Sequence, residues 1–152
     1  MKIPKSKLSK NSLKERAIVV TGAGSGIGRA LSFELAKNNA DLILLSRDQI
    51  KLDSLQDDIK EKFGIEPLTV EFAFFQAKEK DYNFLIENLI DNYTKIDGLI
   101  HVAGILGYLS PFTSTSPSQL ETVMKINFES NFLLTKALMP VLEKSECPSV
   151  IF

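Results

Sequence analysis

Short apolar runs alternate with longer stretches of mixed polarity along almost the whole chain. The apolar runs suit buried strands and lie at Ala17–Thr21, Asp41–Leu45, Leu68–Phe75, Gly98–Val102 and Ser149–Phe152. The stretches between them predict helices at about Gly26–Asn38, Gln49–Phe63, Asp81–Tyr93 and Pro117–Met139. Four strand–helix units followed by a fifth strand predict an α/β fold, a doubly wound parallel sheet with helices on both faces. The pattern stops inside the fifth strand, so we expect the fold to be truncated there.

The fourth predicted helix has the clearest boundary signals. Ser116 can cap its first turn, Pro117 suits the first helical position, and Gln119 completes a capping box. Pro140 is expected to end or kink the helix. One face combines apolar side chains with two amides, which would need hydrogen-bond partners if buried: Leu120, Met124, Asn127, Asn131, Leu134 and Leu138.

Composition narrows the class of protein. A chain of 152 residues with 44% hydrophobic and 24% charged residues suits one globular domain. A net charge of −1 argues against a nucleic-acid binder, and no apolar run is long enough to span a membrane. The single cysteine, Cys147, and the single histidine, His101, leave no disulfide and no Cys/His metal site, which fits the cytoplasm. Residues 1–15 are interpreted as a basic, solvated arm before a domain at 16–152.

The densest glycine cluster, V-T-G-A-G-S-G-I-G at Val20–Gly28, follows a predicted strand and opens a predicted helix. Such a turn can hold a diphosphate on free backbone N–H groups and the positive end of the helix dipole. The common G-x-G-x-x-G pattern fails because Ile27 stands where its third glycine should be. The triphosphate-loop pattern fails as well, because Gly28 is followed by Arg29 rather than Lys.

The spacing that does fit is T-G-x-x-x-G-I-G, from Thr21 to Gly28. It resembles the glycine motif of the short-chain dehydrogenase/reductase family, whose fold is Rossmann-like. The resemblance implies that this loop, with Thr21, binds a nicotinamide dinucleotide. Gly22, Ser25, Gly26 and Ile27 would approach its pyrophosphate and ribose, while Gly28 would permit close packing of the helix. A methyltransferase-like nucleoside fold is disfavoured because its glycine loop lacks this spacing.

The end of the second strand indicates which dinucleotide is bound. An acidic residue usually accepts hydrogen bonds from the ribose there when the cofactor lacks a 2′-phosphate. This chain has Ser46 at that position and then Arg47, which can pair with a 2′-phosphate. NADP is therefore favoured over NAD. The alternative is that Arg47 only pairs with Asp48 or faces solvent.

The fourth strand carries a second resemblance, in D-G-L-I-H-V-A-G at Asp97–Gly104. Ala103 and Gly104 match the family's N-N-A-G region, and the resemblance implies that they lie against the adenosine side of the cofactor. Val102 departs from the usual Asn, and 71–77 lacks the Asp that commonly meets the adenine. His101 is interpreted as a packed imidazole. The run from Asp97 to Gly107 is similar to a bacterial branch of probable oxidoreductases.

Asn127, in V-M-K-I-N, matches the family's active-site Asn, which the resemblance implies would hold a water on the proton-relay path. A purely structural amide is the alternative. The family's acid is a Tyr followed four residues later by Lys, and the three tyrosines here are followed at that spacing by Ile86, Asp97 and Phe112. The family's catalytic Ser and Tyr lie beyond the fifth strand. We therefore expect no turnover by this chain.

The first hypothesis is the cofactor-binding part of an NADP-dependent oxidoreductase that transfers hydride between NADPH and a small carbonyl or alcohol substrate. The second hypothesis is a non-catalytic dinucleotide-binding or interaction module. Self-association as a homo-oligomer through the open edge of the sheet is a further expectation.

Overall fold

The computed structural model describes residues 12–152 and contains one parallel sheet of five strands in the order β3-β2-β1-β4-β5. The strands are β1 (Ala17–Thr21), β2 (Asp41–Ser46), β3 (Leu68–Glu71), β4 (Gly98–Ile100) and β5 (Ser149–Ile151). The helices are α1 (Gly26–Lys37), α2 (Gln49–Phe63), α3 (Glu79–Ile90), α4 (Pro117–Met124) and α5 (Ser130–Leu142). A short 3₁₀ helix, η1 (Phe112–Ser114), precedes α4, and a π-helical turn, η2 (Lys125–Glu129), joins α4 to α5.

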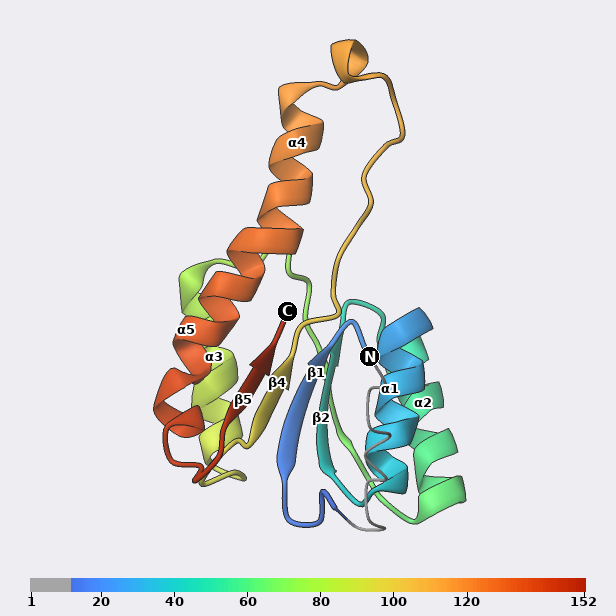
Figure 1. Ribbon diagram of the computed structural model, residues 1–152, viewed down its shortest axis with the longest axis vertical. Helices are drawn as coiled ribbons and strands as arrows, with labels where there is room; N and C mark the ends of the chain where they lie inside the picture. The colour runs from blue at the N-terminus through green and yellow to red at the C-terminus, as the bar shows by residue number, and fades with distance from the viewer. Residues whose placement is uncertain (1–11) are drawn as a thin grey trace, which may run out of the picture.

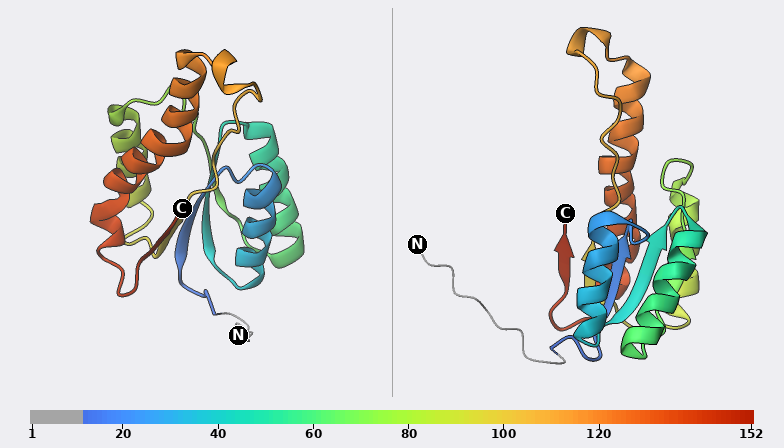
Figure 2. Two further views of the ribbon diagram at one scale, coloured as in Figure 1. Left: turned by 45° about the horizontal axis from the view of Figure 1, so that its top comes forward. Right: turned by 90° about the vertical axis from the view of Figure 1, so that its right-hand side faces the viewer.

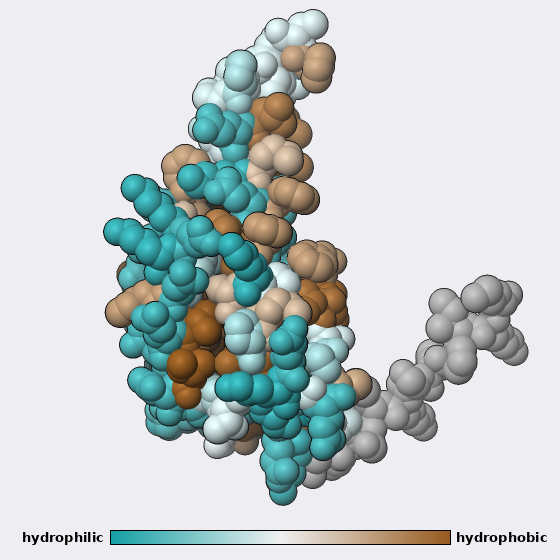
Figure 3. Space-filling view, turned by 90° about the vertical axis from the view of Figure 1, so that its left-hand side faces the viewer, coloured by the Kyte–Doolittle hydropathy of each residue, from teal (hydrophilic) through white to brown (hydrophobic). Residues whose placement is uncertain are grey.

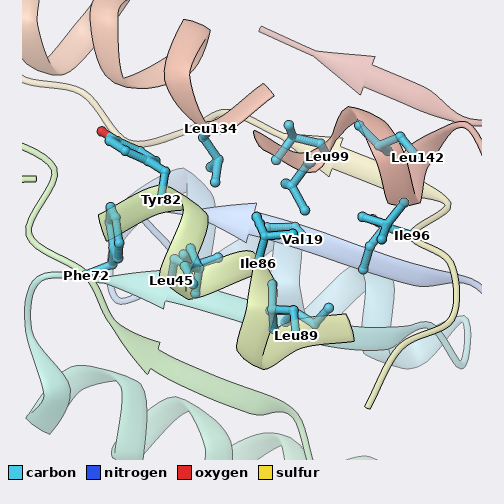
Figure 4. Packing of buried hydrophobic residues seen from close by; sticks show 14 of the residues in the cluster. Val19, Leu45, Phe72, Tyr82, Ile86, Leu89, Ile96, Leu99, Leu134 and Leu142 are labelled. Carbon is cyan, nitrogen blue, oxygen red and sulfur yellow. The ribbon is translucent and has the colours of Figure 1, made fainter. Parts of the chain in front are cut away.

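Helices cover both faces of the sheet, as a doubly wound fold requires (Figures 1 and 2). Alternate residues of each strand point to opposite faces, so each strand contributes to two separate cores. Ile18 and Leu42 pack with α1 and α2, whereas Val19 and Ile43 pack with α3 and α5. Figure 4 shows the second of these cores, where Tyr82 lies near Phe72 and Leu134. The predicted α/β, Rossmann-like fold is confirmed.

β5 ends one residue before the predicted Phe152, and two other strands end at least two residues earlier than the sequence pattern predicts. β3 stops at Glu71 rather than Phe75, because its partner β2 ends at Ser46 and the last cross-strand bond runs from the Phe72 N–H to the Ser46 carbonyl, 2.8 Å. β4 stops at Ile100 rather than Val102. The His101 N–H still bonds to the Ile151 carbonyl of β5, 2.9 Å, but the Val102 and Ala103 N–H groups bond to the Thr21 side chain of β1 instead of a strand carbonyl. The apolar runs continue into both loops and do not mark where pairing ends.

The third helix runs over Glu79–Ile90 rather than Asp81–Tyr93. It begins earlier because the Asp81 carboxylate accepts a hydrogen bond from the Lys78 N–H, 2.8 Å, and so satisfies a donor ahead of the first turn. Beyond its end, the Tyr93 N–H bonds to the Leu89 carbonyl in a closing turn, 2.9 Å.

The single predicted helix Pro117–Met139 is interrupted by η2 and continues to Leu142. Pro140 lies inside α5 and does not end it, although proline removes a backbone donor at a cost of about 3 kcal/mol. Val141 and Leu142 are each only 2% exposed, so burial of their side chains offsets that loss. The capping box at Ser116 and Gln119 is present as predicted.

α4 projects beyond the end of the sheet, together with the chain that leads into it (Figures 1 and 2). The expected buried stripe therefore holds only for Leu134 and Leu138, whereas Leu120 and Met124 are exposed. Figure 3 shows apolar side chains along this projecting part. The sheet that would have covered the first half of the helix does not reach that far.

Most of the predicted N-terminal arm, residues 1–11, lies outside the described residues. Of the remainder, Leu13 packs against the core on the α1–α2 side, and its N–H bonds to the Asn38 carbonyl, 3.2 Å. No helix among residues 12–152 is long and apolar enough to cross a membrane.

Asp97 is a buried carboxylate at the amino end of β4, at the opposite end of the sheet from the glycine loop. It accepts hydrogen bonds from Ser145 Oγ at 2.7 Å, Arg16 at 2.7 Å, the Ala17 N–H at 3.0 Å and Lys95 at 3.1 Å. Burial alone would raise the pKa of this carboxyl, but these four donors outweigh it and hold the pKa well below its usual range. The charged form of Asp97 therefore ties β1, β4 and the turn before β5 together.

Replacing Asp97 with Asn should lower the free energy of unfolding by about 3 kcal/mol near neutral pH, because its four donors lose the buried carboxylate that accepts their hydrogen bonds. Since the folded-state pKa is depressed, this stabilisation is present above about pH 4 and is lost as the pH falls toward the folded-state value. Urea unfolding of both proteins across that range measures the difference, which should shrink in acid. Asp57→Asn, at an exposed site on α2, is the control. Equal stability of Asp97→Asn and the parent at neutral pH would contradict this role.

Candidate functional site

A cleft of about 570 Å³ opens at the carboxyl ends of the strands, near the switch in strand order between β1 and β4. Ligands of open α/β sheets bind at this position, and the volume suits a small molecule or cofactor. The cleft is lined by the glycine loop, the end of β2 and the segments that follow β3 and β4. Its lining residues are Gly22, Ser25, Gly26, Ile27, Ser46, Arg47, Ala73, Phe74, Phe75, Gln76, Val102, Ala103, Gly104, Ile105, Thr122 and Ile126.

Thr21 and Gly22 join the glycine loop to the segment after β4. The buried Thr21 hydroxyl oxygen accepts hydrogen bonds from the Val102 and Ala103 N–H groups, each at 3.0 Å. Gly22 has a φ of +66°, and a Cβ there would lie 2.8 Å from the Ala103 nitrogen. Glycine is therefore required on both conformational and steric grounds. Thr21 does not line the cleft but fixes the two segments that do.

The amino end of α1 faces the cleft. Ser25 precedes the first helical turn and makes no side-chain capping bond, so the first backbone N–H groups of α1 remain available. No acidic residue lies in that turn. A Cβ on Gly28 would lie 2.3 Å from the Gly22 carbonyl oxygen, so only glycine lets the helix approach the loop this closely. The geometry suits an anion.

The end of β2 places Ser46 and Arg47 in the same cleft. Ser46 is buried, and its hydroxyl accepts a hydrogen bond from the Asp48 N–H at 3.3 Å. Arg47 is exposed and forms no ion pair or hydrogen bond within residues 12–152. Asp48 instead pairs with Lys51, 2.9 Å between Oδ2 and Nζ, and caps α2. The Lys51 hydrogen bonds lower the pKa of Asp48. Arg47 therefore keeps its donors available to a ligand.

Asn127 fixes the segment that follows Gly104. Its Nδ2 donates to the Ile105 carbonyl and its Oδ1 accepts from the Ile105 N–H, both at 2.8 Å. The amide is exposed rather than buried, and it lies inside η2. The second amide of the predicted stripe, Asn131, donates to the Asn127 carbonyl at 2.9 Å. Both amides therefore have hydrogen-bond partners, and the Asn127 side chain bonds to the backbone of a residue that lines the cleft.

His101 does not line the cleft. It is buried, its Nε2 lies 2.9 Å from the Thr135 hydroxyl, and its ring stacks on Phe152 with centroids 4.9 Å apart. Burial lowers the pKa of His101 to about 4, so the ring is neutral at physiological pH. This environment is the packed imidazole that the sequence indicated.

Sequence reasoning missed part of the cleft wall. Ala73–Gln76 follow β3, Ile105 follows Gly104, and Thr122 and Ile126 come from the helix opposite. The signal lies in the 71–77 stretch, where Phe74, Phe75 and Gln76 follow β3. Among the described residues that line the cleft, Arg47 is the only charged one.

Residues 16–152 match the sequence model of the short chain dehydrogenase family. The chain belongs to the short-chain dehydrogenase family. One relative is the uncharacterized oxidoreductase YciK of Escherichia coli K12, 35% identical over 140 residues that cover 92% of this chain and 56% of YciK. Another is a very-long-chain 3-oxoacyl-CoA reductase of Phaeosphaeria nodorum, 34% identical over 91% of this chain and 41% of that protein.

Solved structures of the short-chain dehydrogenase family share the arrangement described above. A short chain dehydrogenase from E. coli CFT073 complexed with NADPH is 34% identical, with a TM-score of 0.91 over 93% of this chain and 59% of that one. This chain thus spans about half the length of the curated relatives it matches. Within residues 12–152, no three His, Cys, Asp or Glu side chains gather as a metal site would require.

Proposed function

We propose that this chain is the NADP-binding part of a short-chain oxidoreductase. The observation that carries the proposal is Arg47, an unpaired cation in a cleft that no carboxylate of the described residues lines. A 2′-phosphate would find an available guanidinium there and no opposing negative charge, and Arg can hold a phosphate through two hydrogen bonds. The NADPH complex of the E. coli relative supports the same cofactor.

The residues around Arg47 fit the rest of a dinucleotide. The amino end of α1, with Gly22, Ser25, Gly26 and Ile27, would hold the pyrophosphate, because its N–H groups are free and a Cβ on Gly22 would collide with Ala103. Ser46 would lie beside the adenosine ribose, and the backbone of Ala103 and Gly104 would lie along the cofactor. When bound, the nicotinamide would supply or accept hydride.

Asn127 would serve this site by positioning the backbone of Ile105. Its side chain holds Ile105, and Ile105 lines the cleft two residues beyond Ala103. The amide uses one N–H and one lone pair on Ile105, so a water held on a proton path would bond to its second N–H, to its second lone pair or to the backbone around η2.

Replacing Arg47 with Met should weaken NADPH binding about 10- to 100-fold, as expected for loss of a charge-assisted hydrogen bond. NADH lacks the 2′-phosphate, so its affinity should stay unchanged. Calorimetric titration of both dinucleotides gives the two Kd values. Lys144→Met removes the same charge at an exposed position outside the cleft and serves as the control. Equal loss of NADPH and NADH affinity in Arg47→Met would contradict the proposed phosphate contact.

The pure chain should bind NADPH without oxidising it in the presence of a broad carbonyl panel. Reduction of a carbonyl needs a proton donor at the developing alkoxide, and no Tyr in the sequence is followed four residues later by Lys. The loss of NADPH absorbance over time, compared with protein-free samples, measures turnover. Carbonyl-dependent oxidation above that background would show that another group supplies the proton.

A further inference from the structure

The segment Ala73–Gln76 lies beside the expected adenosine ribose, and the inference drawn from it rests on the proposed function. Ser46 pairs with Glu71 in the sheet, and the Phe72 N–H donates to the Ser46 carbonyl at 2.8 Å. The chain after β3 therefore leaves the sheet next to Ser46 and Arg47, and it lines the same cleft. A base attached to a ribose at Arg47 would meet this segment, because the pyrophosphate occupies the α1 side.

This segment offers the base one exposed aromatic ring, that of Phe75, and one amide, that of Gln76. Phe74 is buried against Phe72, with ring centroids 5.0 Å apart, whereas Phe75 is 46% exposed. The Lys125 ammonium lies 6.0 Å from the Phe75 ring centroid. The exposed Gln76 side chain makes no hydrogen bond within residues 12–152. The carboxylates on either side of this segment, Glu71 and Glu79, do not line the cleft, and Glu79 pairs with Lys136.

An amide and a carboxylate read a purine differently. A carboxylate only accepts hydrogen bonds, so it suits the 6-amino group of adenine and meets the 6-oxo oxygen of hypoxanthine as another acceptor. A glutamine amide both donates and accepts, and turning it over matches either base. Stacking on an aromatic ring does not discriminate, because every base has a π-face.

We infer that the base subsite of this cleft accepts both 6-amino and 6-oxo purine dinucleotides, with Gln76 as the group that reads the purine 6-position. A carboxylate at this edge would restrict the site to adenine. The Gln76 amide and the exposed Phe75 ring admit either base and leave the binding of the pyrophosphate and the 2′-phosphate unchanged.

The test compares NADPH with reduced nicotinamide hypoxanthine dinucleotide phosphate, titrated calorimetrically into the intact chain. Their Kd values should agree within about threefold, a difference of less than one hydrogen bond. Gln76→Glu should open a gap of at least about tenfold in favour of NADPH, because its carboxylate opposes the 6-oxo oxygen. Asn88→Asp, the same amide-to-acid change at an exposed site on α3, should keep the ratio of the parent chain. Gln76→Ala should weaken both ligands equally.

Two outcomes would overturn the inference alone: NADPH binding to the parent chain more than about tenfold tighter than the hypoxanthine analogue, or a parent-like ratio in Gln76→Glu. Failure of NADPH itself to bind would overturn the proposed function and this inference together. The ratio of the two Kd values separates base reading from the general effect of an added negative charge, which Asn88→Asp measures.

Discussion

The contact between the Thr21 hydroxyl and the N–H groups of Val102 and Ala103 is the constraint on which the site depends. It joins the carboxyl ends of β1 and β4 beside the switch in strand order, where parallel pairing between them has ended. Gly22 can then pass against Ala103, and Gly28 can bring α1 against the loop. A side chain at Gly22 would push the glycine loop away from Ala103, and one at Gly28 would push α1 away from the glycine loop. The cleft is thus a consequence of how two strands end.

The two ends of the sheet differ in how their charged and hydrogen-bonding groups are used. At the amino end, the buried Asp97 carboxylate gathers four donors and secures β1 and β4. At the carboxyl end, donors are left available: the first N–H groups of α1, the guanidinium of Arg47 and the amide of Gln76. Negative charge is therefore used for stability at one end, while the other end keeps positive potential for a phosphate-bearing ligand.

The order of elements and the glycine loop could be predicted from the sequence because both depend on local pattern. Apolar runs mark strands, and the T-G-x-x-x-G-I-G spacing requires a particular turn. Features that depend on distant partners could not be predicted. The π-helical turn at Asn127 accompanies hydrogen bonds to Ile105, 22 residues earlier in the chain. α5 continues past Pro140 because Val141 and Leu142 reach a core built mainly from other elements. Phe74, Phe75 and Gln76 line the cleft because β3 can pair only as far as its partner β2 extends, and the chain leaves the sheet after that point.

The central claim is that one cleft holds the pyrophosphate at the amino end of α1 and the 2′-phosphate at Arg47. Amide chemical shifts of the ¹⁵N-labelled chain during titration with NADPH and then NADH test it most directly. With NADPH, the largest shifts should fall on Gly22–Gly28 and on Ser46–Arg47. With NADH, the shifts in the glycine loop should persist, while those around Arg47 should be much smaller. Shifts that leave the glycine loop untouched, or that are the same around Arg47 for both dinucleotides, would contradict the account.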